Sequence, residues 1–166
     1  MAYSNIVFQF SQIAKSLKEL AHTEEHHAFS RVGSLRDMDE FLSQLNFITG
    51  AQLVFVDSDS GRLDDSSKSD NLMDKSFYTF CVLKKVSSGD YDESQSVKAD
   101  CRLIVKKILS KLFYFKRHRS NGFGDLERSS IYYDAVGPIA QGYYGTMVSF
   151  NINAPAGIIF NNDDWI

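Results

Sequence analysis

Cysteine is scarce in this chain: its 166 residues include only two, Cys81 and Cys101. Two cysteines do not make the kind of disulfide framework that stabilises small secreted domains, and both lie within apolar segments. We therefore predict two buried free thiols in a protein that folds in a reducing compartment. A chain of this length buries enough surface to be stable without a metal or a disulfide.

Long apolar runs are also lacking. No run approaches the ~20 residues that span a bilayer, and the N-terminus lacks the basic region and cleavage pattern of a signal peptide. The net charge is small: 18 Lys and Arg residues and 21 Asp and Glu residues give −3. A general DNA-coating protein is normally basic overall, so this class is disfavoured. We expect synthesis in the cytoplasm, no membrane partner, and a single domain over residues 1–166.

Catalytic motifs are equally scarce. The chain has no G-x-S-x-G, no C-x-x-C and no phosphate loop ending in Lys-Ser/Thr. Asp57–Gly61 resembles the start of a calcium loop, but its glycine comes one residue early, and the twelfth residue is Lys68 rather than Glu. Asn121–Gly124 has two close glycines but follows a predicted helix, which favours a turn. We predict no catalytic residues, no cofactor and no enzyme activity.

One pattern permits a different interpretation. His22, Glu25 and His26 fit the spacing H-x-x-E-H, which on a helix places two histidines on one face to hold zinc and the glutamate as general base. The alternatives are a small metal-dependent hydrolase, adventitious metal binding together with His27, and an ordinary solvated helix end. A non-catalytic binding domain is a further alternative, although the sequence carries no pocket signature.

Apolar periodicity indicates several helices and strands. Spacings of three and four residues predict a helix over residues 4–21 and a second over about 34–49, with Ser34 as its N-cap. Residues 51–57 form a compact apolar run, typical of a buried strand. Residues 76–86 are apolar on both faces, which predicts a central strand.

The second half of the chain carries the longest helix signal. A continuous apolar stripe predicts an amphipathic helix over about residues 96–118, capped by Asp92 or Ser94. Two aromatic-rich strands follow, over residues 131–139 and 143–152. The predicted fold is α+β, with a mostly antiparallel sheet packed against one long amphipathic helix and additional N-terminal helices. We expect a flexible loop over residues 58–75 and a C-terminal docking tail over residues 153–166.

Two groups of side chains are candidate contact residues. Basic residues off the apolar stripe of the long helix suit either nucleic-acid phosphates or an acidic patch on another copy. Apolar and aromatic residues near the C-terminus are costly to leave in water and so predict an interface, with Trp165 as an anchor. The basic candidates are Lys106, Lys107, Lys111, Lys116, Arg117 and Arg119. The interface candidates are Tyr143, Tyr144, Ile158, Ile159, Phe160 and Trp165.

The order helix, strands, long helix and strand pair resembles that of the neck and tail-terminator (tail-completion) structural proteins of tailed bacteriophages. The resemblance is carried by ADCRLIVKKILSKL, a short Gly-containing loop, and SSIYYDAVGPIAQGYYGTMVSFNI, preceded by a polar loop between strands; the ending NNDDWI is similar to those of some phage structural proteins. The chain departs from simple members in having two predicted helices before residue 50, where those have one.

The resemblance implies a virion protein without catalysis. It would form a homo-oligomeric ring, which we expect to be a hexamer, at the neck or tail-terminator position. Its partners would be other copies, other phage neck, portal or tail-tube proteins, and DNA touched non-specifically in transit.

Overall fold

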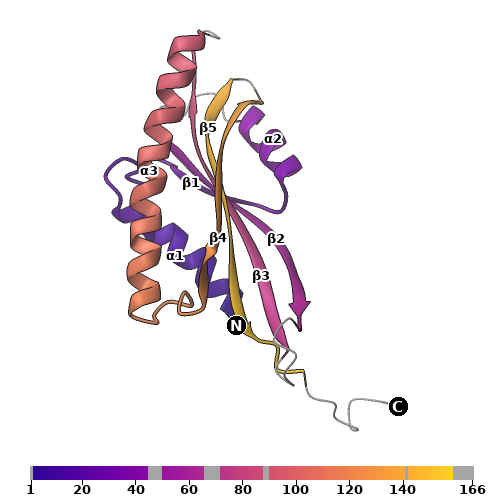
Figure 1. The fold of residues 1–166 in the computed structure, drawn as a ribbon. Coiled ribbons are helices and arrows are strands. Elements are labelled where there is room, and N and C mark those ends of the chain that lie inside the picture. Colours follow the sequence, from indigo (N-terminus) through magenta and orange to yellow (C-terminus); the bar gives the residue numbers. More distant parts are fainter. Residues whose placement is uncertain (1, 45–49, 66–71, 88–89, 141, 159–166) are drawn as a thin grey trace.

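The computed structural model describes residues 2–44, 50–65, 72–87, 90–140 and 142–158. Within these ranges the chain forms three helices and five strands (Figure 1). They are α1 (Ala2–Ser16), β1 (Phe29–Val32), α2 (Leu35–Gln44), β2 (Gln52–Asp64), β3 (Met73–Lys85), α3 (Tyr91–Arg117), β4 (Leu126–Ile139) and β5 (Tyr143–Pro155).

The strands form one mixed sheet in the order β1-β2-β3-β5-β4. β1 pairs in parallel with β2, and the remaining neighbours are antiparallel. The α+β class and the single long helix are therefore confirmed, and the sheet is mixed because of β1. Helices α1 and α3 lie on one face of the sheet and α2 lies on the other (Figure 1).

The main core lies between the sheet and the two helices α1 and α3. Phe10 of α1 is fully buried at its centre, with ring centroids 4.9 Å from Phe55, 5.0 Å from Phe80 and 6.3 Å from Phe150. The apolar stripe of α3 faces the same core, as its spacing predicted. Its buried members are Cys101, Ile104, Val105, Ile108, Leu112 and Phe115.

A smaller core lies beneath α2, on the opposite face. Met38 and Leu42 of this helix pack with Cys81, Leu83 and Tyr143 of the sheet. Because helices cover both faces here, β3 is apolar on both sides, and its position between β2 and β5 confirms the predicted central strand. Both cysteines are buried and free, also as predicted.

Several predicted boundaries were wrong. Helix α1 ends at Ser16 rather than residue 21; residues 18–20 form a turn, and Ala21 has a positive φ of 46°. Helix α3 begins at Tyr91, capped by Asp90, whose carboxylate accepts the Asp92 N–H at 2.9 Å. Ser34 caps α2 as expected, with its hydroxyl accepting the Asp37 N–H at 3.1 Å. Residues 45–49 of the expected second helix lie outside the described residues.

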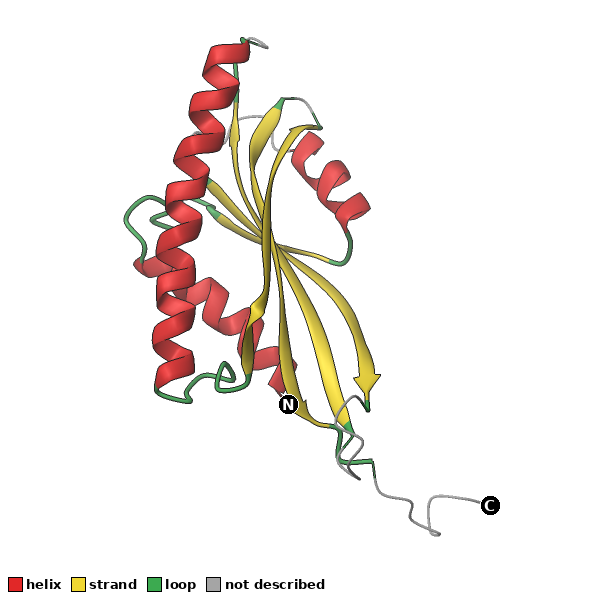
Figure 2. Ribbon diagram, in the orientation of Figure 1, coloured by secondary structure: helices red, strands yellow, loops and turns green. Residues whose placement is uncertain are grey.

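The predicted loop over residues 58–75 is shorter than expected at both ends. β2 continues to Asp64 and β3 begins at Met73, so much of that stretch is paired strand, and residues 66–71 lie outside the described part. The far ends of β2 and β3 diverge from α3 (Figure 2). Together with the end of β5 they form a projection that we name the distal arm, made of residues 58–64, 73–77 and 153–158.

Candidate interaction surfaces

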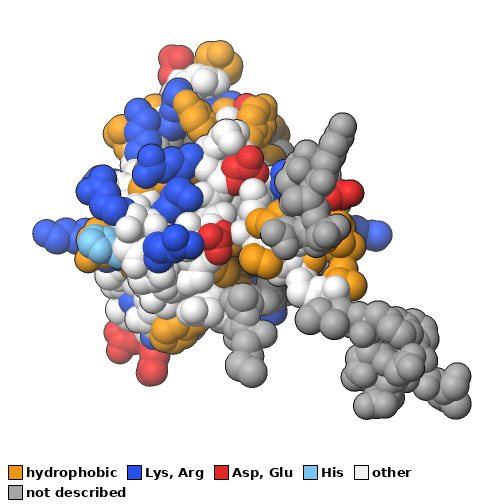
Figure 3. Space-filling model, turned by 60° about the horizontal axis from the view of Figure 1, so that its bottom comes forward, with side chains coloured by type: hydrophobic (Ala, Val, Ile, Leu, Met, Phe, Trp, Pro, Cys, Tyr) orange, Lys and Arg blue, Asp and Glu red, His pale blue; other side chains and the backbone are white. Residues whose placement is uncertain are grey.

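The outward side of α3 is basic. No Asp or Glu occurs from Cys101 to Gly124, and the apolar stripe faces the sheet, so the Lys and Arg side chains lie on the solvent side. In Figure 3, which is turned by 60° from Figure 1, Lys and Arg side chains gather on the side where α3 lies. The net negative charge of the whole chain therefore conceals a local positive surface.

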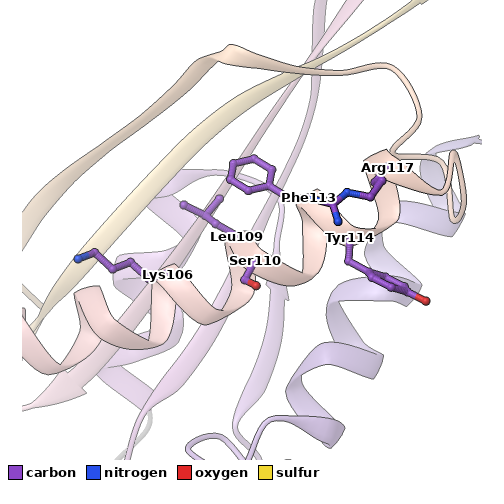
Figure 4. A pocket seen from close by; sticks show the side chains of 6 residues that line it. All are labelled: Lys106, Leu109, Ser110, Phe113, Tyr114 and Arg117. Carbon is purple, nitrogen blue, oxygen red and sulfur yellow. The ribbon is translucent and has the colours of Figure 1, made fainter.

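Two open grooves mark this surface. The first, of about 670 Å³, lies between α3 and β4, and its cationic lining residues are Lys98, Arg102 and Lys106. The second, of about 540 Å³, shares Lys106 and continues along the C-terminal half of α3 to Arg117 (Figure 4). In the second groove, the aromatic side chains are Phe113 and Tyr114.

The six predicted basic contact residues make different contacts in the structure. Lys107 forms an ion pair with Glu19 of the chain that follows α1. Lys116 donates hydrogen bonds to the carbonyl oxygens of Leu126 at 2.6 Å and Gly124 at 3.4 Å, which ties the end of α3 to the turn before β4.

Arg119 lies 3.6 Å from the Asp125 carboxylate, and the Lys111 ammonium lies 5.3 Å from the ring centroid of Tyr114. Only Lys106 and Arg117 of the six line the two grooves. The sequence analysis missed Lys98 and Arg102. Lys98, Arg102 and Lys106 follow one another at intervals of four residues, which places all three on one side of a helix, and this was the available signal.

The C-terminal interface candidates also differ in how exposed they are. Tyr143 is buried beneath α2, and Tyr144 is half-buried with Lys98 5.4 Å from its ring centroid. Ile158 is 65% exposed at the end of the distal arm. Leu63, which the sequence analysis did not single out, is 55% exposed on the same arm. The other three candidates, Ile159, Phe160 and Trp165, lie outside the described residues.

The histidines do not lie on a helix. α1 ends at Ser16, so His22 and His26 fall in the connection between α1 and β1, and the helical H-x-x-E-H arrangement is not formed. His22 accepts the Ala28 N–H through Nδ1 at 3.1 Å, and burial lowers the pKa of its imidazole. Across the described ranges, no group of three or more His, Cys, Asp or Glu is placed to hold a metal ion.

The fold thus defines an α+β domain with a five-stranded mixed sheet, a basic helix and a projecting arm. Neither a family model nor a curated protein nor a solved structure matches this chain. Of the helices in the described part of the chain, none combines the length and apolar character needed to cross a membrane.

Proposed function

We propose that the protein is a structural virion protein of a tailed bacteriophage, forming a homo-oligomeric ring at the neck or tail-terminator position. The ring joins the tail to the head or portal. The proposal starts from the resemblance in the order of elements. From α2 onward the chain has a helix, two strands, the long helix and a strand pair, and α1 and β1 precede them. The work of such a protein is assembly, so its important surfaces are contact surfaces rather than a catalytic centre.

The distal arm is the observation that carries the proposal. Every residue of β2 from Ser58 to Leu63 is exposed, and the arm holds the exposed apolar side chains of Leu63 and Ile158. Burying apolar surface stabilises a contact by roughly 25 cal/mol per Å². On a projection these side chains have no core of their own, so a second molecule is the natural place to bury them.

A ring requires the arm to dock on a different surface of the next copy. Contacts between two unlike surfaces are heterologous, and they generate a closed ring when the rotation between copies divides the circle evenly. The distal arm at one end of a single-domain subunit suits this head-to-tail arrangement. The remaining partners are neighbouring neck, portal or tail-tube proteins and the DNA that passes through the ring.

The test compares assembly of matched variants. Mass by light scattering and shape by negative-stain imaging are measured over a range of protein concentrations. Leu63→Ser, and a chain shortened after Gly157, remove apolar surface from the arm. Phe8→Ser is the matched control, because Phe8 is exposed to a similar extent, 56%, but belongs to α1 rather than to the arm.

We expect rings or stepwise oligomers for the full chain and for Phe8→Ser, and a shift toward monomers for both arm variants. A full chain that stays monomeric at every concentration, alone and with tail or neck proteins, refutes the proposed function. Rings that survive both arm changes refute the role of the arm.

A further inference from the structure

We propose that the groove between α3 and β4, together with the adjoining groove along the C-terminal half of α3, binds the phosphodiester backbone of nucleic acid. The inference rests on the proposed function for its natural ligand, which is DNA in transit through the ring. It is carried by the arrangement of charge on the surface of a single chain, so it is measured separately from assembly.

The cations of the first groove form a regular row. Lys98, Arg102 and Lys106 follow one another at intervals of four residues, and a helix rises ~6 Å over four residues. Their charged groups therefore succeed one another along the helix at a spacing close to that of successive phosphates on a nucleic-acid strand. Arg117 extends the row into the second groove through the shared Lys106. A row of this kind contacts a backbone without reading its sequence.

These cations form no ion pairs with the carboxylates in the described part of the chain. In the described part of the chain, the carboxylate-paired Lys and Arg residues lie outside the row: Arg31, Lys75, Lys84, Lys107 and Arg119. No carboxylate there forms an ion pair with Lys98, Arg102, Lys106 or Arg117. Asp134 is the acidic residue of the first groove, and its side chain accepts the N–H of Ala135 at 2.8 Å.

Aromatic rings position several of the cations instead. Arg102 donates to the hydroxyl of Tyr133 at 2.6 Å, and its guanidinium lies 4.9 Å from the centroid of that ring. Lys98 lies 5.4 Å from the Tyr144 centroid. A ring attracts a cation through its quadrupole and carries no net charge. The side chains are thus held in place while their full positive charge stays available to an anion, which favours phosphate binding.

The acidic surface of α2 on a second copy of the chain is a less suitable occupant. The exposed acidic residues of α2 are Asp37, Asp39 and Glu40, but Arg36 lies among them. Asp39 also accepts the Ala140 N–H at 2.8 Å. This surface offers a short and partly occupied set of carboxylates, whereas a nucleic-acid backbone offers an unbroken series of charges.

The test uses two adjacent lysines. Lys106→Gln and Lys107→Gln make the same chemical change one residue apart on α3, but Lys106 lines both grooves and Lys107 is ion-paired with Glu19. Fluorescence anisotropy measures binding of each full-length variant to a short mixed-sequence duplex DNA and to one of its single strands, from low to physiological salt. Circular dichroism verifies the fold of each variant.

We expect the unchanged protein to bind and Lys107→Gln to bind within about twofold of it. The double variant Arg102→Gln/Lys106→Gln should bind at least ~10-fold more weakly, with a slope of log affinity against log salt shallower by about 2. A preference for the duplex identifies DNA in transit as the ligand. A preference for the single strand identifies an unpaired strand, with stacking on Tyr114 or Tyr133.

Three results overturn the inference. The first is no binding to either DNA at low salt. The second is equal weakening by Lys106→Gln and Lys107→Gln, which reduces the effect to overall charge. The third is a loss of self-association without any DNA binding, which assigns the row to another copy of the chain. Rings without DNA binding leave the proposed function standing, whereas DNA binding by a permanent monomer removes that function and retains the groove.

Discussion

Replacing two phenylalanines of α1, one at a time, tests how this helix is placed. Phe10 is fully buried among the aromatic rings of the sheet, whereas Phe8 on the same helix is 56% exposed. Both changes to Ala alter helix propensity equally, so the difference between them reports packing alone. The change at Phe10 removes a fully buried ring and leaves a cavity, whereas the Phe8 side chain is less than half buried to begin with.

The expected magnitudes differ several-fold. A buried Phe→Ala change destabilises a core by about 3–5 kcal/mol, whereas a largely exposed one costs about 1 kcal/mol or less. For a domain of this size, each kcal/mol lowers the melting temperature by about 2–4 °C, so Phe10→Ala should melt ~6–20 °C lower. The total free energy of unfolding of a typical domain is only ~5–15 kcal/mol, so this single change removes a large share of it.

Urea unfolding followed by far-ultraviolet circular dichroism measures both variants. The measurement is made at low protein concentration, so that self-association does not add to stability. The midpoint should fall much more for Phe10→Ala than for Phe8→Ala, at an unchanged slope with denaturant. Equal losses for the two variants, or a loss below about 1 kcal/mol for Phe10→Ala, would refute the placement of α1 against the sheet.

Three further predictions concern the sheet, the thiols and His22. A β-carbon at Gly145 would clash with the backbone carbonyl oxygen of Val82 in β3. Gly145→Ala should therefore lower the free energy of unfolding by several kcal/mol in the same urea assay. Gly124→Ala is the control and should be nearly neutral, because its β-carbon would have no neighbour closer than 3.5 Å. Burial raises the pKa of Cys81 and of Cys101 to about 12. A thiol reagent at mildly alkaline pH should therefore label neither cysteine in the native protein and both cysteines after unfolding. Rapid labelling of the native protein would contradict their burial. Burial lowers the pKa of His22. Its contribution to stability is therefore fully present above the unfolded pKa of about 6.5 and declines as pH falls below it. Melting curves across this range should show a loss of stability that His22→Gln reduces, and an identical pH dependence in the variant would contradict the assignment.

The sequence predicted the elements whose hydrophobic pattern is long and regular. The stripe from Cys101 to Phe115 repeats over four turns, and its burial against the sheet follows from that repeat. The two-sided apolar character of β3 likewise predicted its central position in the sheet. In each case, one local pattern matches one packing environment, and no knowledge of distant parts of the chain is needed.

Elements that depend on distant partners were missed. β1 has only four residues, Phe29–Val32, in a polar stretch, and exists as a strand because β2 lies beside it. The exposed part of β2 reads as a Ser- and Asp-rich loop, yet its backbone is paired with β3 from Ser60 to Asp64. The sequence likewise could not show which basic candidates are ion-paired, because the pairing of Lys107 with Glu19 and of Arg119 with Asp125 is decided by tertiary contacts.

Among the described elements, β5 follows the other four strands in the sequence. It nevertheless lies between β3 and β4 and pairs with both. A nascent chain that stops before Tyr143 exposes two unpaired strand edges, and its long helix has only part of a sheet to cover. Non-local pairing of this kind is slow, and the sheet cannot be completed before β5 has been synthesised. A product truncated before β5 should therefore fail to form the folded sheet and should be left to chaperones and proteases.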